Sequence, residues 1–275
     1  AVVRNDLKEA IEADLLTQTL PTMRTVDVLV SLTGGWALVV SASESTQDHV
    51  RKKFFQAFQV RLEETEPLCF LGEEARTVHD LAFPSFEEGA SIEIPRGGSL
   101  PEKERRIVPP EALAAFFAWT WWKAEVDPHL LDGEDGLEDT TLWVDDRLAF
   151  RVAGEARASV TVACGDAATA EESRTALRTG RLPAALHLAV RVGERETTLR
   201  VAGGDLRIAS AKLPSVLKGG DLHEVLLERA FLYEEAFRVV RALFMVFGRS
   251  VATRWEKDIR KMRNWIAEDG VEEEE

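Results

Sequence analysis

Three clusters of basic side chains are the residues of this sequence whose types and spacing best suit a chemical task. The first cluster is consecutive, and the second recurs at three or four residues, which places it on one helix face and the exit of that helix. In the third cluster Arg254, Lys257 and Lys261 fall on one side of the last helix, with Arg260 and Arg263 adjoining it. Such a stripe suits a nucleic-acid backbone, because Lys and Arg displace the counterions around phosphates. The clusters are Arg51, Lys52 and Lys53; then Arg174, Arg178 and Arg181; then Arg254, Lys257, Arg260, Lys261 and Arg263.

Each cluster also has a purely structural interpretation. Salt bridges to nearby acids would explain any single member of the first two clusters equally well. For the third cluster the alternatives are a stripe that faces DNA, a self-association surface and a solvated helix face. Residue types and spacing leave these alternatives open.

Catalytic motifs are absent from the sequence. It contains no P-loop, no GxGxxG after a strand, no HExxH and no GxSxG. The five histidines fall in separate segments, although a fold could still assemble a catalytic base from them. Paired carboxylates could bind a divalent ion, but 48 acids produce such pairs by chance. We therefore expect no enzyme, no cofactor, no metal site and no small-molecule substrate.

The charge of the chain is unevenly distributed. A net charge of −14 argues against indiscriminate coating of nucleic acid. Acids concentrate in residues 63–93 and 125–139, whereas residues 249–265 are rich in bases. A positive surface on a negative protein is therefore compatible with the composition.

Membrane and disulfide classes are not indicated. No apolar run is long enough to span a bilayer, so we expect a cytoplasmic protein without membrane contact. Cys69 and Cys164 lie far apart without a CxxC or a His-rich neighbourhood, and we expect both to be small buried residues.

The first part of the chain shows a helix, a hairpin and a second helix. An amphipathic helix from Lys8 stops before Pro21, and alternating apolar residues around Gly34 and Gly35 predict a hairpin. A helix capped by Ser43 or Ser45 follows and runs to about residue 58. We expect a short strand at 60–62 and a loop-rich stretch over 69–110.

An aromatic helix is predicted over residues 112–125. Its five aromatic residues point to nearly all sides of the helix, which is typical of a helix buried between layers. Stacking on nucleic-acid bases is the alternative.

The second half alternates hairpins and helices. We expect a hairpin over 141–152 that turns at residues 145–147, a strand at 160–162, and a helix from a Thr169–Glu172 capping box to Gly180. A hairpin that turns at Gly193, a strand at 206–209, a helix over 222–247 and a final basic helix complete the chain. The fold class is therefore α+β, with antiparallel hairpins packed against helices.

The order of these elements resembles a known family. The residues that carry the resemblance are KEAIEADLLTQTLPTMRTVDVLVSLTGGWALVVSAS, QDHVRKKFFQAF, FFAWTWWKAE, TAEESRTALRTGRL, ASAKLP and LERAFLYEEAF, in that order. The series is similar to the recombination-associated protein RdgC family. Members carry an N-terminal portion before the point where this sequence begins, so we expect a fragment.

The resemblance implies a function. RdgC-like proteins are ring-shaped homodimers that enclose double-stranded DNA without sequence preference or catalysis, and they limit the RecA recombinase. It implies an RdgC-like α+β fold and a nucleoid-associated protein in the cytoplasm. It also implies DNA contacts at Arg51, Lys52, Lys53, Arg174, Arg178 and Arg181.

Two departures from the family remove DNA contacts that the resemblance would otherwise imply. Gln18 and Leu20 replace a basic and an aromatic residue, and Gly165 and Asp166 replace a lysine and a glutamine. The alternatives are a protein-interaction or scaffold module that has lost DNA binding, and an enzyme. The expected organisation is a helix–hairpin–helix unit (1–66), a loop-rich excursion (67–111), an α+β domain (112–268) and an acidic disordered tail (269–275).

Overall fold

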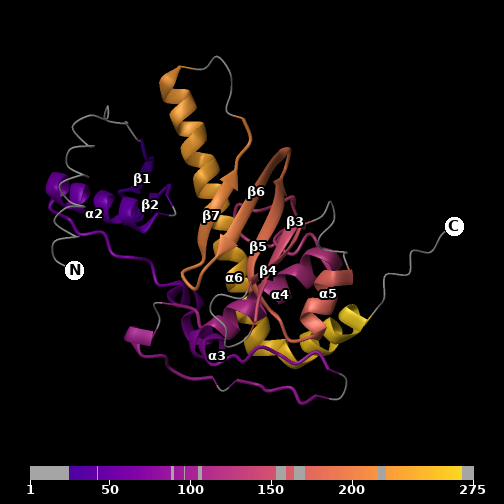
Figure 1. Cartoon of the computed structure of the whole chain (residues 1–275). Coiled ribbons are helices and arrows are strands. Elements are labelled where there is room, and N and C mark those ends of the chain that lie inside the picture. The colour runs from indigo at the N-terminus through magenta and orange to yellow at the C-terminus, as the bar shows by residue number, and fades with distance from the viewer. Residues whose placement is uncertain are drawn as a thin grey trace, which may run out of the picture. The chain divides into compact units, whose positions relative to one another are not determined.

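The computed structural model describes residues 25–41, 43–87, 90–95, 97–104, 107–152, 159–163, 171–215 and 221–267. Two compact units divide the chain after Gln59 (Figure 1). The predicted first helix, Thr169, Cys164, the two departures from the family and the acidic tail lie outside the described residues.

The first unit contains the predicted hairpin and the helix that follows it. Strands β1 (Val28–Ser31) and β2 (Trp36–Val39) pair antiparallel. Gly35 has a φ of 64° in the turn, a conformation that glycine adopts without strain. Helix α2 (Glu44–Phe58) begins at Ser43, whose hydroxyl accepts the N–H of Thr46. Both predictions are confirmed, with Ser43 rather than Ser45 as the cap.

The second unit begins with helical turns where the sequence predicts loop. The 3₁₀ segment η1 (Pro67–Glu74) and helix α3 (Ala75–His79) bury Leu68, Leu71 and Val78. These residues recur at helical spacing, so the proline-based prediction of a loop is wrong here. The predicted strand at 60–62 is also wrong, because these residues pair with no described strand. A short 3₁₀ turn, η2 (Glu102–Glu104), follows.

Cys69 corrects a further expectation, because it is exposed on η1, where its thiol donates a hydrogen bond to the carboxylate of Glu66 at 3.4 Å.

The aromatic helix forms the centre of the core. Helix α4 (Pro110–Val126) buries residues on every side. Phe116 packs edge-on against Phe244 with ring centroids 5.4 Å apart, and Trp119 packs against Phe247 at 5.5 Å. The five aromatic residues of the helix are at most 3% exposed. The core interpretation is therefore confirmed, and no ring face is left on which a base could stack.

A five-stranded antiparallel sheet covers α4, in the order β4-β3-β5-β6-β7. Its strands are β3 (Thr140–Arg151), β4 (Ser159–Ala163), β5 (Leu182–Val192), β6 (Arg195–Ala202) and β7 (Arg207–Lys212). The predicted hairpin around Gly193 is confirmed, as are the predicted strands at 160–162, which lies in β4, and at 206–209, which corresponds to β7.

The predicted turn at residues 145–147 is wrong. Strand β3 continues through this segment, with a shift of register against β5 between Val144 and Leu148. Both of these residues face the core, so a bulge accommodates the polar residues between them without ending the strand.

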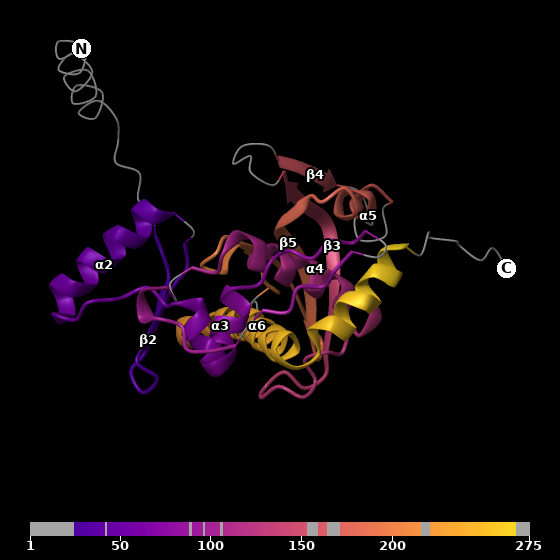
Figure 2. The same cartoon turned by 90° about the horizontal axis from the view of Figure 1, so that it is seen from below.

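Two helices complete the unit. Helix α5 (Glu171–Arg178) ends at Gly180, which has a φ of 73°, and the N–H of Arg181 bonds the carbonyl of Ala176. The long element α6 (Leu222–Ala267) contains one non-helical residue, Arg254, where it changes direction (Figure 2).

The break in α6 therefore comes later than the predicted residue 247. The buried face of α6 starts near Leu232, since Leu226 in the first turns is 51% exposed. Helices and antiparallel sheets together confirm the α+β class. In the described part of the chain, no helix combines the length and the apolar composition that a bilayer crossing requires.

Candidate nucleic-acid interface

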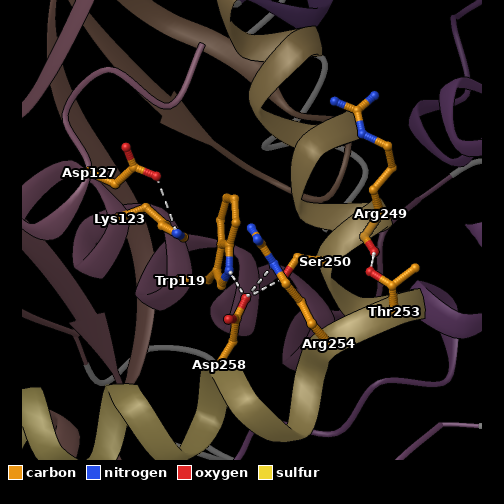
Figure 3. Close-up of polar contacts among 8 residues, drawn as sticks. All are labelled: Trp119, Lys123, Asp127, Arg249, Ser250, Thr253, Arg254 and Asp258. Atoms are coloured by element: carbon orange, nitrogen blue, oxygen red, sulfur yellow. Dashed lines mark hydrogen bonds and ion pairs between the residues drawn. The ribbon is translucent and has the colours of Figure 1, made fainter. Parts of the chain in front are cut away.

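A buried carboxylate fixes the bend in α6. Asp258 is 3% exposed, and it accepts hydrogen bonds from the indole N–H of Trp119 at 3.2 Å and from the hydroxyl of Ser250. The guanidinium of Arg254 approaches the same oxygen at 3.3 Å (Figure 3). A buried charge is tolerated when it is paired and hydrogen-bonded in this way. The three donors join α4 to both arms of α6.

The residues just before the bend end the first arm of α6. The hydroxyl of Thr253 bonds the carbonyl of Arg249 at 2.6 Å, which satisfies an acceptor in the last turn of the first arm. Arg254 then has φ −145° and ψ 17°, outside the helical range. The second arm therefore starts at Trp255 in a new direction and carries the third basic cluster.

Four members of this cluster line a hollow of about 560 Å³, which we call the bend depression. Its lining includes Arg254, Lys257, Arg260 and Lys261, the single acid Glu256, and Asn264. Arg260 pairs with Glu256, and Arg254 is held by Asp258. Lys257 and Lys261 are exposed one turn apart and pair with no described acid. Two of the four cations are therefore available to an external anion.

The fifth member has a different role. The guanidinium of Arg263 donates to the carbonyl of Ser85 from two nitrogens, at 3.1 and 2.9 Å, and approaches the carbonyl of Ser91 at 3.5 Å. These contacts hold the loop before α4 against the second arm of α6. Arg263 therefore belongs to the internal structure rather than to the stripe in which the sequence places it.

The second cluster points toward the interior. Arg178 donates two hydrogen bonds, at 3.1 and 2.7 Å, to the carbonyl of Ile266, near the end of α6. A cation at this position complements the partial negative charge of a helix C-terminus. Arg174 pairs with Glu125 at 3.4 Å and lies over the ring of Trp265, with a side chain only 14% exposed.

Glu125 collects several donors at this junction. It accepts the indole N–H groups of Trp121 at 2.7 Å and Trp265 at 2.6 Å, in addition to Arg174. The predicted shared face of α5 is thus used to join α5 to α4 and α6. Arg181 is half-buried at the exit of the helix. A DNA contact by this cluster stays a prediction.

The first cluster lies on α2 in the other unit. Arg51 pairs with Asp48 at 2.9 Å, and Lys52 and Lys53 are exposed. Their contact with DNA also stays a prediction.

Groups suited to acid–base or metal chemistry do not converge among the described residues. His79 contacts Asp80 at 2.8 Å on the surface of α3. Burial acts to raise the pKa of Asp80, but hydrogen bonds from His79 and Arg76 outweigh it and hold that pKa below its usual value. Within the described ranges, no three His, Cys, Asp or Glu side chains are placed to hold a metal ion.

Sequence reasoning found the basic residues of the bend depression but missed the cluster that positions them. Asp258 resembles any acid of a mixed-charge helix, and Trp119 is one of five aromatic residues in α4. Only the spacing of Arg254 and Asp258, four apart, hinted at a pair.

No family model, curated protein or solved structure matches this chain. Its function must therefore be inferred from its own residues.

Proposed function

We propose that this protein binds double-stranded DNA without sequence preference and without catalysis. The observation that supports this proposal best is the bend depression, where four cations and one acid line a single hollow of a strongly acidic chain. Phosphate contacts by Lys and Arg supply most of the affinity in non-specific binding. They carry no sequence information, because every nucleotide presents the same phosphate.

Local charge rather than net charge governs such binding. The acids of the chain repel DNA from most of its surface, so a duplex is directed to the positions where the sign reverses. Arg254 is held in place by the buried Asp258, which lowers the entropy that this side chain loses on contact with a phosphate. Lys257 and Lys261 supply mobile charge beside it.

The cellular role that we propose follows from the resemblance to the RdgC family. The chain is a diverged member that acts at the nucleoid as a homodimer and modulates homologous recombination by limiting RecA. The order of the sequence blocks supports this role.

Titration of duplex DNA at several salt concentrations tests the binding proposal. We expect binding that weakens steeply with salt and is equal for duplexes of unrelated sequence. The double variant Lys257→Ala, Lys261→Ala should lower the salt slope by about 2, since each lost phosphate contact removes about 0.9. Glu256→Gln is a control that keeps both lysines. Absence of binding by the unmodified chain at low salt would exclude the function.

A second candidate is supported by an exposed apolar surface. The first turns of α6 expose four large apolar side chains: Leu222, Leu226, Leu227 and Phe231. Such a patch is typical of a protein interface. We propose a second copy of this chain as the occupant, as the homodimer implied by the resemblance requires. Sedimentation equilibrium should show a dimer that Leu226→Glu dissociates, and a monomeric unmodified chain would contradict it.

A further inference from the structure

The five-stranded sheet has a second face, opposite the face on which α4 packs. Alternate residues of its strands, among them Leu142, Leu188 and Leu199, are buried toward α4. The residues between them point the other way. We call this second surface the basic sheet face. Its polar and aromatic members are Trp143, Asp145, Arg147, Arg151, His187, Arg191, Glu196, Thr198, Arg200, Arg207, Ser210 and Lys212.

Strand register places these side chains on one surface. Arg200 of β6 lies opposite His187 of β5 and Ser210 of β7, and Lys212 lies opposite Thr198. Directly opposed residues of antiparallel strands project to the same side. Arg207 stays on the same side of the sheet despite the bulge in β7, because it lies opposite Ala202, two residues after Arg200 in β6.

Side-chain contacts confirm the assignment at the other end of the face. The guanidinium of Arg191 lies over the ring of Trp143, 5.4 Å from its centroid, and pairs with Glu196 at 3.4 Å. These three residues come from three adjacent strands, β3, β5 and β6. Because these side chains touch one another, they must project from the same side of the sheet.

The basic sheet face is positively charged, whereas the protein as a whole is negatively charged. Among the residues whose side chains the structure describes, this face carries six of the 34 basic residues and two of the 48 acids, Asp145 and Glu196. A positive surface of this density attracts a polyanion even though the whole chain is negative. The positive surface that the composition allows therefore lies on the five-stranded sheet.

The ion pairs on this face do not prevent its cations from binding phosphate. Arg191 and Glu196 are 53% and 55% exposed, and Arg207 and its partner Asp205 are 46% and 38% exposed. Exposed pairs of this kind contribute little free energy, so a phosphate can replace the carboxylate at small cost. Arg151, Arg200 and Lys212 form no ion pair with a described residue.

The size of the face suits a nucleic-acid backbone. Its cations come from four adjacent strands, β3, β5, β6 and β7, which at about 4.8 Å spacing spread them over about 14 Å. One strand of duplex DNA presents a phosphate about every 3.4 Å along the axis, so about four phosphates fall within this width. The cations of the face are therefore sufficient to contact each of these phosphates.

We propose that the basic sheet face is the principal surface by which this protein holds the phosphate backbone of duplex DNA. Arg151, Arg200 and Lys212 are the contacts that need no rearrangement, and Arg191 and Arg207 join them after leaving their carboxylates. This inference rests on the proposed function and assigns it to a surface separate from the bend depression.

The test compares two sets of variants of the full chain in the duplex titration. Arg151→Ala, Arg200→Ala, Lys212→Ala should reduce the salt slope by about 2.7 and weaken binding at least about tenfold near 0.1 M salt. The matched control removes three exposed cations outside the candidate surfaces, Arg61→Ala, Lys103→Ala and Arg241→Ala, and should change either quantity less. Circular dichroism and unfolding curves establish that each variant is folded.

A measurement on the unmodified chain keeps the proposal testable if the triple variant does not fold. Bound duplex should protect Lys212 from acetylation by a water-soluble reagent, whereas Lys103, outside the sheet, should react equally with and without DNA. Binding by the chain without protection of Lys212, or a triple variant with unchanged slope, overturns the basic sheet face alone. Absence of binding by the unmodified chain overturns the proposed function as well.

Discussion

The indole of Trp119 and the carboxylate of Asp258, separated by 139 positions in the chain, form a buried hydrogen bond of 3.2 Å. Trp119 lies in the middle of α4, and Asp258 lies in the second arm of α6, just after the bend. This bond fixes the position of that arm against the centre of the core. The basic residues that follow the bend depend on it for their place on the surface.

Removing the charge of Asp258 should loosen the bend. Asp258→Asn keeps the size of the side chain but weakens the bonds from Arg254 and Ser250, which are strong because the acceptor is ionised. We expect a loss of about 2 kcal/mol in the free energy of unfolding, measured by urea denaturation. Glu256→Gln, at an exposed pair two residues earlier, should change it by less than about 0.5 kcal/mol. Equal effects would contradict the positioning role of Asp258.

Glu125 should be a second determinant of stability. It accepts two indole N–H groups and a guanidinium, and Glu125→Ala would leave Trp121 and Trp265 without these acceptors. We expect a loss of about 2–4 kcal/mol, because unmade bonds of buried donors are costly. Thermal unfolding measures it, and Glu111→Ala in the first turn of α4 is the control. A loss no larger than that of the control would mean that water replaces Glu125.

Within the second basic cluster, Arg178 should stabilise the fold and Arg181 should not. Arg178→Ala removes two bonds to the carbonyl of Ile266, so it should lower the free energy of unfolding by about 1–2 kcal/mol. Arg181→Ala, which removes no ion pair with a described residue, should change it little. Hydrogen exchange at the end of α6 should accelerate only in the first variant. Faster exchange in both variants would show that the loss is not specific to this contact.

Local patterns predicted much of the fold. Alternation around Gly193 gave the hairpin of β5 and β6, and the cap at Ser43 gave the start of α2, because each pattern involves a few neighbouring residues. The continuous strand β3 was missed because Asp145–Arg147 has turn composition. Its continuity depends on Val144 and Leu148 facing the same core, which only the tertiary structure decides.

The candidate surfaces were predicted only in part. Spacing found the basic residues of α6 but could not show that Arg263 bonds a loop carbonyl 178 positions away. It also missed the basic sheet face, whose cations come from four strands and are separated in the sequence by apolar residues. Strand alternation was visible at Arg191 and Arg200, but only the pairing of strands unites their charges.

The stability of α3 should depend on pH through Asp80. Hydrogen bonds from His79 and Arg76 outweigh the effect of burial and hold the pKa of Asp80 below its unfolded value. The folded state therefore gains stability above the unfolded pKa, near 4, and loses it as the pH falls through the lower folded pKa. Asp80→Asn should be less stable than the unmodified chain at pH 6, and the difference should shrink as the solution is acidified below about pH 4. Urea denaturation at a series of pH values measures this difference, and Asp48→Asn, at an exposed pair on α2, is the control. A difference that stays constant from pH 6 to pH 3 would show that Asp80 contributes through its shape or hydrogen bonding and not through its charge.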